Sequence, residues 1–225
     1  MALIMFDLDD TLVDQKAAAQ MWATEFADDW NLTADQAMHL ADALDDRRPK
    51  DEVFARVISE FSLALTADDA WRAYRNRMPE LVRCSDDDKA ALDVLRSEGW
   101  KLGIVTNGMR DNQEGKIRAT GLDRLVDGWA ISSVVGARKP DPQIFESMSR
   151  QLGEPLSGWV VGDSLEMDVI GGSRVGLNTI WLTTDVTELA RHDVEPTLIA
   201  PTVASAARSI VSNGNGQSGL RNEPI

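Results

Sequence analysis

The stretch Leu3 to Thr11 reads LIMFDLDDT, and it decides how the rest of the chain is interpreted. Its four apolar residues, Leu3 to Phe6, predict a short strand that is buried on both faces of a sheet. The strand is followed by three carboxylates, Asp7, Asp9 and Asp10. Carboxylates at the carboxyl end of a parallel strand can hold a hard cation, attack an electrophile or transfer a proton. An acidic turn without function would give the same local pattern, so the decision depends on the rest of the chain.

Composition limits the classes of partner. The chain has 225 residues, enough for one large domain or for a domain that carries a smaller inserted one. Its formal net charge of -14 argues against a nucleic-acid polymer or an anionic membrane as the main partner. An anionic substrate would therefore need a local group of positive charges. Cys84 is the single cysteine, so an intrachain disulfide is excluded. We expect a cytoplasmic protein, because the sequence has neither a signal-peptide pattern nor an apolar run of about 20 residues.

Residues 14–84 predict a helical insertion directly after the first strand. Apolar residues recur there at helical spacing, and no convincing strand pattern interrupts them. Thr33 with Gln36 three residues later has the pattern of a capping box at the start of a second helix. Thr66, followed by two aspartates, marks the start of a fourth. This segment is predicted to be a four-helix bundle.

From about residue 85, strands alternate with helices. The apolar stretches predict strands near residues 101–106, 128–132, 159–162, 178–182 and 198–200. This alternation predicts an α/β fold, a Rossmann-like doubly wound parallel sheet with helices on both faces. The predicted domains are therefore a core of residues 1–13 and 85–211 and a helical cap of residues 14–84. The polar, turn-rich segment 212–225 is expected to be disordered.

The polar residues at the ends of these strands can be read as one site. Parallel strands end at the same edge of a sheet, so the side chains there should converge. They are Asp7 and Asp9, Thr106 and Asn107, Asp163 and nearby Asp168, with Lys139 just before a helix. Oxygen ligands without cysteine or histidine favour Mg²⁺ or a similar hard ion. A lysine and a threonine hydroxyl suit a tetrahedral oxyanion, as phosphoryl transfer requires.

Four motifs, in order, make the chain resemble the haloacid dehalogenase-like (HAD) hydrolase superfamily. They are DLDDT at residues 7–11, VTNG at 105–108, RKPDP at 138–142 and GDS at 162–164 with Asp168. The resemblance extends over about residues 2–185. The helical insertion between the first two motifs looks like the C1 cap of subfamily I, which would close over the site and exclude large substrates.

The resemblance implies a role for each matched carboxylate. Asp7 would be the nucleophile that forms an aspartyl-phosphate. Asp9 would protonate the leaving alcohol and then activate the hydrolytic water. Mg²⁺ would be bound by Asp7, by Asp9 through its backbone carbonyl, and by Asp163. Asp168 would act on the metal indirectly or through water.

The resemblance also implies which residues hold the phosphoryl group. Thr106 and Lys139 would bind its oxygens, and Lys139 would also restrain the charge of the nucleophile. Asn107 and the backbone amides after it, beginning at Gly108, would line the same oxyanion site. Arg110, just after the second motif, is a further candidate for substrate contact. Charge reversal at Arg110 should then raise KM for an anionic substrate.

Asp9 separates the branches of this superfamily. A leaving alkoxide needs a proton, whereas a halide does not. Dehalogenases of the superfamily generally lack an aspartate two residues after the nucleophile, and phosphatases have it. The sequence therefore favours an Mg²⁺-dependent phosphatase for a small phosphorylated metabolite, such as a sugar phosphate or a nucleotide, acting as a monomer or homodimer. The alternatives are a 2-haloacid dehalogenase, a phosphomutase, a phosphonatase and a non-catalytic binding protein.

Overall fold

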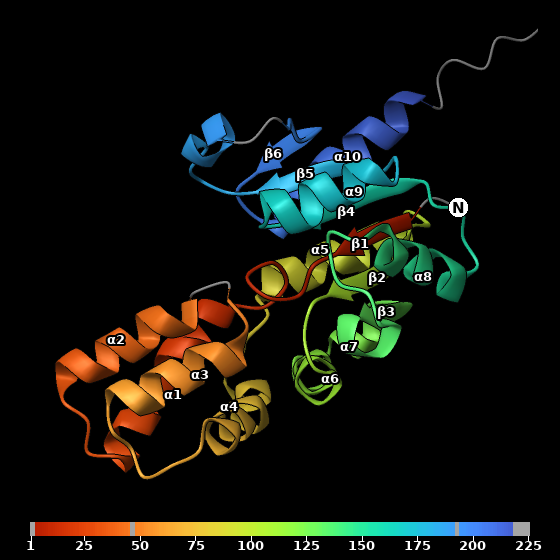
Figure 1. Ribbon diagram of the computed structural model, residues 1–225. Helices are drawn as coiled ribbons and strands as arrows, with labels where there is room; N and C mark the ends of the chain where they lie inside the picture. The colour runs from red at the N-terminus through yellow and green to blue at the C-terminus, as the bar shows by residue number, and fades with distance from the viewer. Residues whose placement is uncertain (1–2, 46–47, 192–193, 218–225) are drawn as a thin grey trace, which may run out of the picture. The chain divides into compact units, whose positions relative to one another are not determined.

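The computed structural model describes residues 3–45, 48–191 and 194–217. Within them the chain forms two compact units, which are considered separately below. The core unit comprises Met1–Val13, Cys84–Met109 and Gly121–Ile225. The helical unit comprises Asp14–Arg83 and Arg110–Thr120. Figure 1 shows the elements of both units along the chain.

The core unit is built on a parallel sheet of six strands in the order β3-β2-β1-β4-β5-β6. The strands are β1 (Leu3–Phe6), β2 (Lys101–Thr106), β3 (Gly128–Ile131), β4 (Gly158–Gly162), β5 (Asn178–Leu182) and β6 (Leu198–Ala200). The α/β class and the parallel sheet predicted from the alternation are confirmed. The strand order reverses beside β1, because β2 lies on one side of it and β4 on the other. Ligands of doubly wound sheets bind at such a switch point.

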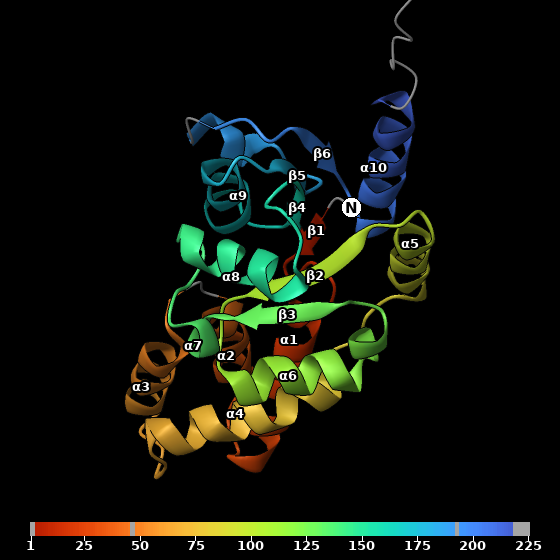
Figure 2. The same cartoon turned by 90° about the vertical axis from the view of Figure 1, so that its right-hand side faces the viewer.

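The sheet carries helices on both faces, as Figure 2 shows. On one face lie α5 (Asp86–Ser97) and α10 (Val203–Gln217), and on the other lie α8 (Pro142–Leu152) and α9 (Gly171–Arg174). Shorter turns complete the unit: η1 (Leu122–Arg124), α7 (Ser132–Val135), η2 (Leu165–Ile170) and η3 (Thr187–Arg191). Because both faces are covered, all four residues of β1 are fully buried, as their apolar run predicted.

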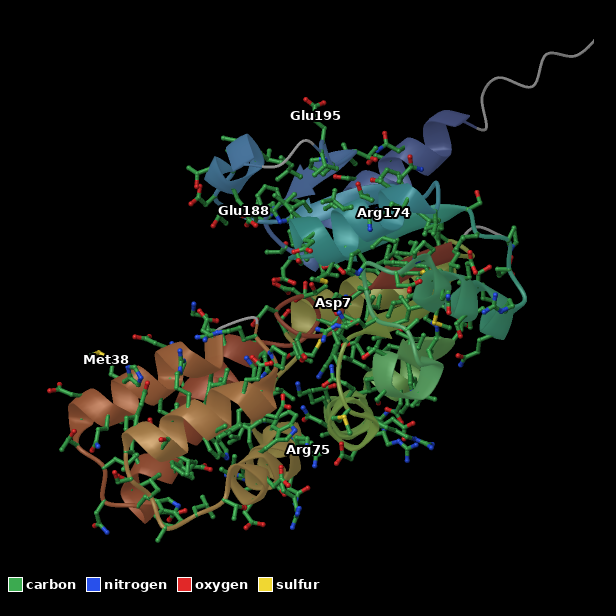
Figure 3. The ribbon with its side chains drawn as sticks, in the orientation of Figure 1. Asp7, Met38, Arg75, Arg174, Glu188 and Glu195 are labelled. Atoms are coloured by element: carbon green, nitrogen blue, oxygen red, sulfur yellow. The ribbon has the colours of Figure 1, made fainter. Side chains whose placement is uncertain are left out.

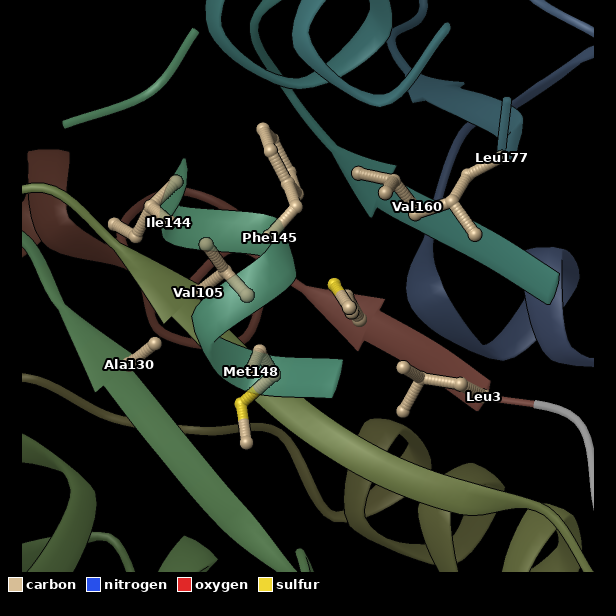
Figure 4. Close-up of a cluster of buried hydrophobic side chains, with 9 residues drawn as sticks. Leu3, Val105, Ala130, Ile144, Phe145, Met148, Val160 and Leu177 are labelled. Atoms are coloured by element: carbon tan, nitrogen blue, oxygen red, sulfur yellow. The ribbon is translucent and has the colours of Figure 1, made fainter. Parts of the chain in front are cut away.

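One apolar cluster fixes α8 against the middle of the sheet (Figure 4). It joins side chains of β1, β2, β3 and β4, and Leu177 just before β5, to α8; its members are Leu3, Met5, Val105, Ala130, Ile144, Phe145, Met148, Val160 and Leu177. Asp141 caps the start of α8 by accepting a hydrogen bond from the Gln143 N–H at 2.9 Å. The start of this helix matters for the site, because Lys139 lies two residues before the cap.

The helical unit contains α1 (Gln15–Asp29), α2 (Ala34–Asp45), α3 (Lys50–Glu60), α4 (Ala67–Leu81) and α6 (Arg110–Ala119). The four helices predicted in the insertion are confirmed. Their aromatic residues pack around Trp22, whose ring centroid lies 5.5 Å from that of Phe54 and 5.1 Å from that of Tyr74. The predicted capping box is also present, with reciprocal hydrogen bonds of 2.9 and 3.2 Å between Thr33 and Gln36.

The packing of α6 in the helical unit differs from the predicted division, which placed residues 110–120 in the core. A partly buried chain of hydrogen bonds links α6 to α1 and α4: Lys116 Nζ donates to Gln15 Oε1 at 2.8 Å, and Gln15 Nε2 donates to the Tyr74 hydroxyl at 2.7 Å. Gly115 lets α4 approach closely, since a Cβ there would lie 2.7 Å from Cγ of Pro79. Such side-chain complementarity cannot be read from apolar periodicity, which is why the sequence did not assign α6 to this unit.

The C-terminal segment differs from expectation in part. The helix α10 runs to Gln217, so the prediction of disorder from residue 212 is wrong for 212–217. The remaining tail, residues 218–225, lies outside the described residues. Among the helices that the structure describes, none is both long enough and apolar enough to span a bilayer.

Candidate active site

The first candidate residue, Asp7, stands directly after β1 at the switch point of the sheet (Figure 3). Its backbone N–H extends the pairing with β4 by donating to the Val161 carbonyl at 2.9 Å. Its Oδ1 accepts a hydrogen bond from the Leu8 N–H at 2.6 Å and contacts Lys139 Nζ at 2.7 Å. The side chain is 13% exposed, so the carboxylate is held firmly but remains reachable.

Lys139 joins two carboxylates in the interior. Its Nζ lies 2.7 Å from Asp7 Oδ1 and 2.7 Å from Asp168 Oδ1, and the lysine and Asp168 side chains are only 2% and 1% exposed. Burial alone would lower the pKa of Lys139, but the negative charges of Asp168 and Asp7 outweigh it and raise that pKa. Lys139 is therefore a permanent cation, the local positive charge that an acidic protein needs to receive an anionic substrate.

Three carboxylates converge beside this lysine. Asp7, Asp163 and Asp168 each offer an oxygen within 4.8 Å of the others. Burial raises the pKa of Asp7; Lys139 opposes this effect, and the charges of Asp168 and Asp163 add to it. Three carboxylates gathered in a small volume repel one another, and a cation among them would relieve that repulsion. The donor set, carboxylate oxygens without sulfur or imidazole, fits a hard divalent cation such as Mg²⁺.

Asp168 lies in a π-helical turn, η2, between β4 and α9. Its Oδ2 accepts a hydrogen bond from the Ser164 N–H at 3.1 Å, while its Oδ1 contacts Lys139. Gly162 makes room for this carboxylate, because a Cβ at that position would lie 2.2 Å from Asp168 Oδ2. The turn begins at Leu165, with Ser164 as its N-cap. The cap hydroxyl accepts from the Met167 N–H at 3.2 Å, a signal that could have located the start.

Asn107 is engaged with the backbone of Lys139. Its Oδ1 accepts from the Lys139 N–H at 2.8 Å, and its Nδ2 donates to the Lys139 carbonyl at 3.1 Å. This two-point contact fixes the loop that carries Lys139. The Gly108 N–H donates to Ser132 Oγ at 2.9 Å, so this amide is also engaged within the core unit. The predicted phosphoryl contacts of Asn107 and Gly108 stay predictions.

The remaining predicted residues lie at different places. Thr106 is buried at the end of β2, one residue before Asn107. Asp9 is half-buried in the loop after β1, and its carboxylate is not part of the three-carboxylate cluster. Asp10 is exposed with a φ of 55°, as suits an aspartate in a turn. Arg110 belongs to the helical unit, where its Nε pairs with Glu114 Oε1 at 2.9 Å on the surface.

Two residues that the sequence did not single out contact the backbone of Asp163. Thr11 Oγ1 accepts from the Asp163 N–H at 3.2 Å, and Trp181 Nε1 donates to the Asp163 carbonyl at 2.8 Å. Thr11 lies within the first motif, and Trp181 lies on the strand beside β4, so the sequence places both residues near the predicted site. It does not show that both contact the backbone of Asp163, because that contact depends on how the sheet packs.

Comparison with known proteins agrees with this geometry. A family model described as haloacid dehalogenase-like hydrolase matches residues 4–182. The chain belongs to this family. The resemblance inferred from the four motifs is thereby confirmed.

Relatives of this HAD-like hydrolase include phosphatases. This chain is 36% identical over 132 residues to pyrimidine 5'-nucleotidase YjjG of Escherichia coli strain K12. The alignment covers 58% of this chain and 56% of that protein. It is 31% identical over 123 residues to glyceraldehyde 3-phosphate phosphatase of Methanothermobacter thermautotrophicus, covering 54% of each. The chain thus spans slightly more than half the length of these two relatives.

A solved structure resembles the hydrolase over nearly its whole length. A HAD phosphatase from Thermococcus onnurineus superposes with a TM-score of 0.68 and 26% sequence identity. The match covers 93% of this chain and 97% of that one. The shared fold extends well beyond the segments that align closely with the two sequence relatives.

Proposed function

We propose that the protein is an Mg²⁺-dependent phosphatase that hydrolyses a small phosphorylated metabolite. The observation that carries the proposal is the position of the Asp7 carboxylate. It lies at the switch point of the sheet, 2.7 Å from a buried lysine and within 4.8 Å of two further carboxylates. This combination supplies a nucleophile, a fixed positive charge and a donor set for a hard cation in one place.

The metal would be held by Asp7, by Asp163 and by the backbone carbonyl of Asp9. Asp168 contributes less directly, because its two oxygens already contact Lys139 and the Ser164 N–H. When bound, Mg²⁺ supplies positive charge that compensates the carboxylates and the phosphoryl oxygens. An ion in this place also relieves the repulsion among the carboxylates of the cluster.

Asp7 would attack the phosphorus atom. Both described donors to its carboxylate contact Oδ1, the Leu8 N–H and Lys139 Nζ, which favours Oδ2 as the attacking atom. As the bond from Oδ2 to phosphorus forms, the bond from phosphorus to the ester oxygen breaks, and Asp9 donates a proton to the departing alcohol. Lys139 compensates the charge on Asp7 before the attack and on the phosphoryl oxygens during it.

The second step returns the enzyme to its starting state. Asp9, now a carboxylate, accepts a proton from water as the water oxygen attacks the phosphorus atom of the aspartyl-phosphate. The bond between Asp7 and phosphorus breaks, inorganic phosphate leaves, and Asp9 is protonated again. One water molecule is consumed and one alcohol is released, so each turnover is a net hydrolysis.

Asp9 favours phosphatase over dehalogenase activity. A halide leaves as an anion and needs no proton, so a dehalogenase has no use for an acid at this position. The two named relatives act on a pyrimidine nucleotide and on a triose phosphate, both small phosphate monoesters. We infer a substrate of the same class for this protein. A phosphomutase would use the same core residues and is distinguished by its products.

The test is hydrolysis of p-nitrophenyl phosphate by the purified protein with Mg²⁺ or with EDTA. The proposal predicts release of nitrophenol that requires the metal and that disappears in Asp7→Asn while the circular-dichroism spectrum stays unchanged. Turnover of a panel of nucleotides and sugar phosphates then identifies the substrate class. Full activity of Asp7→Asn, or release of chloride from 2-chloropropionate without phosphate release from any ester, would contradict the proposal.

A further inference from the structure

The backbone of Asp163 is held on both sides by side chains from neighbouring elements. Its N–H donates to Thr11 Oγ1 at 3.2 Å, and its carbonyl accepts from Trp181 Nε1 at 2.8 Å. Thr11 belongs to the loop after β1, and Trp181 to β5. The two side chains are 8% and 1% exposed, so water competes little for either hydrogen bond.

The register of the sheet places the indole where it can make this contact. Trp181 pairs with Gly162 across β4 and β5, and Asp163 is the next residue along the chain. A buried tryptophan normally finds a partner for its N–H group, and here that partner is the carbonyl of a residue in the acidic cluster. The indole therefore fixes the point at which the chain leaves β4.

The same side chain also contacts the turn that carries Asp168. Trp181 packs with Leu165 and Val169, both fully buried residues of η2, and Asp168 lies directly before Val169. One tryptophan thus restrains two of the three converging carboxylates, Asp163 by a hydrogen bond and Asp168 by packing of its helical turn. Leu189, which is partly buried, also packs against this cluster.

We infer that Trp181 and Thr11 are positioning residues that hold Asp163 in the geometry required to bind a divalent cation. The inference rests on the proposed Mg²⁺ site and adds the residues that set its affinity. Mg²⁺ demands nearly ideal octahedral geometry, so a small rotation of one ligand is costly. Groups that orient the ligands of a metal typically change its affinity by roughly 10- to 100-fold when they are removed.

The experiment measures the dissociation constant for Mg²⁺ directly, by isothermal titration calorimetry without substrate. Two variants remove one hydrogen bond each: Trp181→Phe removes the indole donor, and Thr11→Val removes the acceptor while keeping the side-chain shape. Both should bind Mg²⁺ about 10-fold more weakly than the wild type at a temperature where each is folded. Leu189→Ala is the matched control, because it removes packing from the same cluster but leaves both hydrogen bonds; it should lower Tm without changing the dissociation constant.

The outcomes separate this inference from the proposed function. If the wild type binds Mg²⁺ and both variants bind it equally well, the positioning role is wrong and the phosphatase proposal is unaffected. If all variants that lower Tm weaken binding in proportion, the residues act only through stability, which also overturns the inference. If the wild type binds no Mg²⁺, both the metal site and the positioning role are refuted. Should Trp181→Phe not fold, Thr11→Val decides the question alone.

Discussion

Replacing Lys139 by methionine tests the electrostatics of the site most severely. Methionine has a similar length but no charge, so Lys139→Met leaves Asp7, Asp163 and Asp168 close together without the ammonium group that contacts two of them. Removing one partner from a buried ion pair costs about 3–5 kcal/mol. For a chain of this size, each kcal/mol lowers Tm by about 2–4 °C. We therefore expect a Tm about 6–20 °C below that of the wild type in EDTA.

The decrease in Tm caused by Lys139→Met should become larger as pH rises. Without the lysine, the pKa of Asp7, which burial raises and Lys139 lowers, should lie still further above its value in the unfolded chain. Such a group stabilises the fold below its unfolded pKa, about 3.9 for aspartate, and that contribution is lost as pH rises through the folded pKa. The Tm difference between wild type and variant should therefore be smaller at pH 5 than at pH 8. Addition of Mg²⁺ should recover part of it, since a bound cation stabilises the folded state.

Thermal denaturation followed by circular dichroism measures both effects. Lys101→Met is the matched control, because Lys101 is 35% exposed and pairs with Asp127 at 2.9 Å near the surface of the same unit. Its loss should cost less than about 1 kcal/mol. If Lys139→Met melts within about 2 °C of the wild type in EDTA, or no lower than Lys101→Met, the assigned electrostatics are refuted.

Three further variants test separate features. Gly162→Ala would displace Asp168 from its present position, so we expect a large loss of kcat in a folded protein; wild-type kcat would contradict the steric argument. Thr33→Ala removes the capping box at the start of α2 and should lower the free energy of unfolding by about 1 kcal/mol. Activity should not change, and a loss of activity would show that this capping box affects catalysis. For Asp127, burial raises the pKa, but hydrogen bonds, one from the Leu102 N–H, outweigh it and lower that pKa. This carboxylate stabilises the fold above its unfolded pKa and stops doing so as pH falls through the folded value. The cost of Asp127→Asn in urea denaturation should therefore be about 1–2 kcal/mol at pH 7 and should decrease as pH falls into the acid range; a cost that does not change with pH would contradict the shift.

The sequence predicts the core sheet well because its strands are short apolar runs that end in polar residues. β1, β2, β5 and β6 begin and end at the predicted residues, and β3 and β4 each differ by one residue at one end. The carboxylates after β1 and β4 meet as the topology requires. These features depend on periodicity and on the rule that parallel strands share one edge. The first is a property of the local sequence, and the second holds for any parallel sheet, so neither requires knowledge of side-chain packing.

What the sequence did not reveal depends on partners far along the chain. Asn107 is bonded to the backbone of Lys139, Trp181 to that of Asp163, and Lys116 to Gln15. Each residue type alone is compatible with many partners, and the packed fold selects one. The start of η2 at Leu165 is a different case, because its N-cap, Ser164, is a signal in the local sequence.

The central claim is that Asp7 carries the phosphoryl group during turnover, and it can be tested directly. The enzyme is mixed with p-nitrophenyl phosphate and Mg²⁺, quenched in acid within the first turnover, and digested for mass spectrometry. We predict that the peptide containing Asp7 gains the mass of one phosphoryl group, that alkali removes it, and that Asp7→Asn never shows it. Phosphate release by the wild type with no modified Asp7 peptide at any quench time, and undiminished release by Asp7→Asn, would contradict the claim.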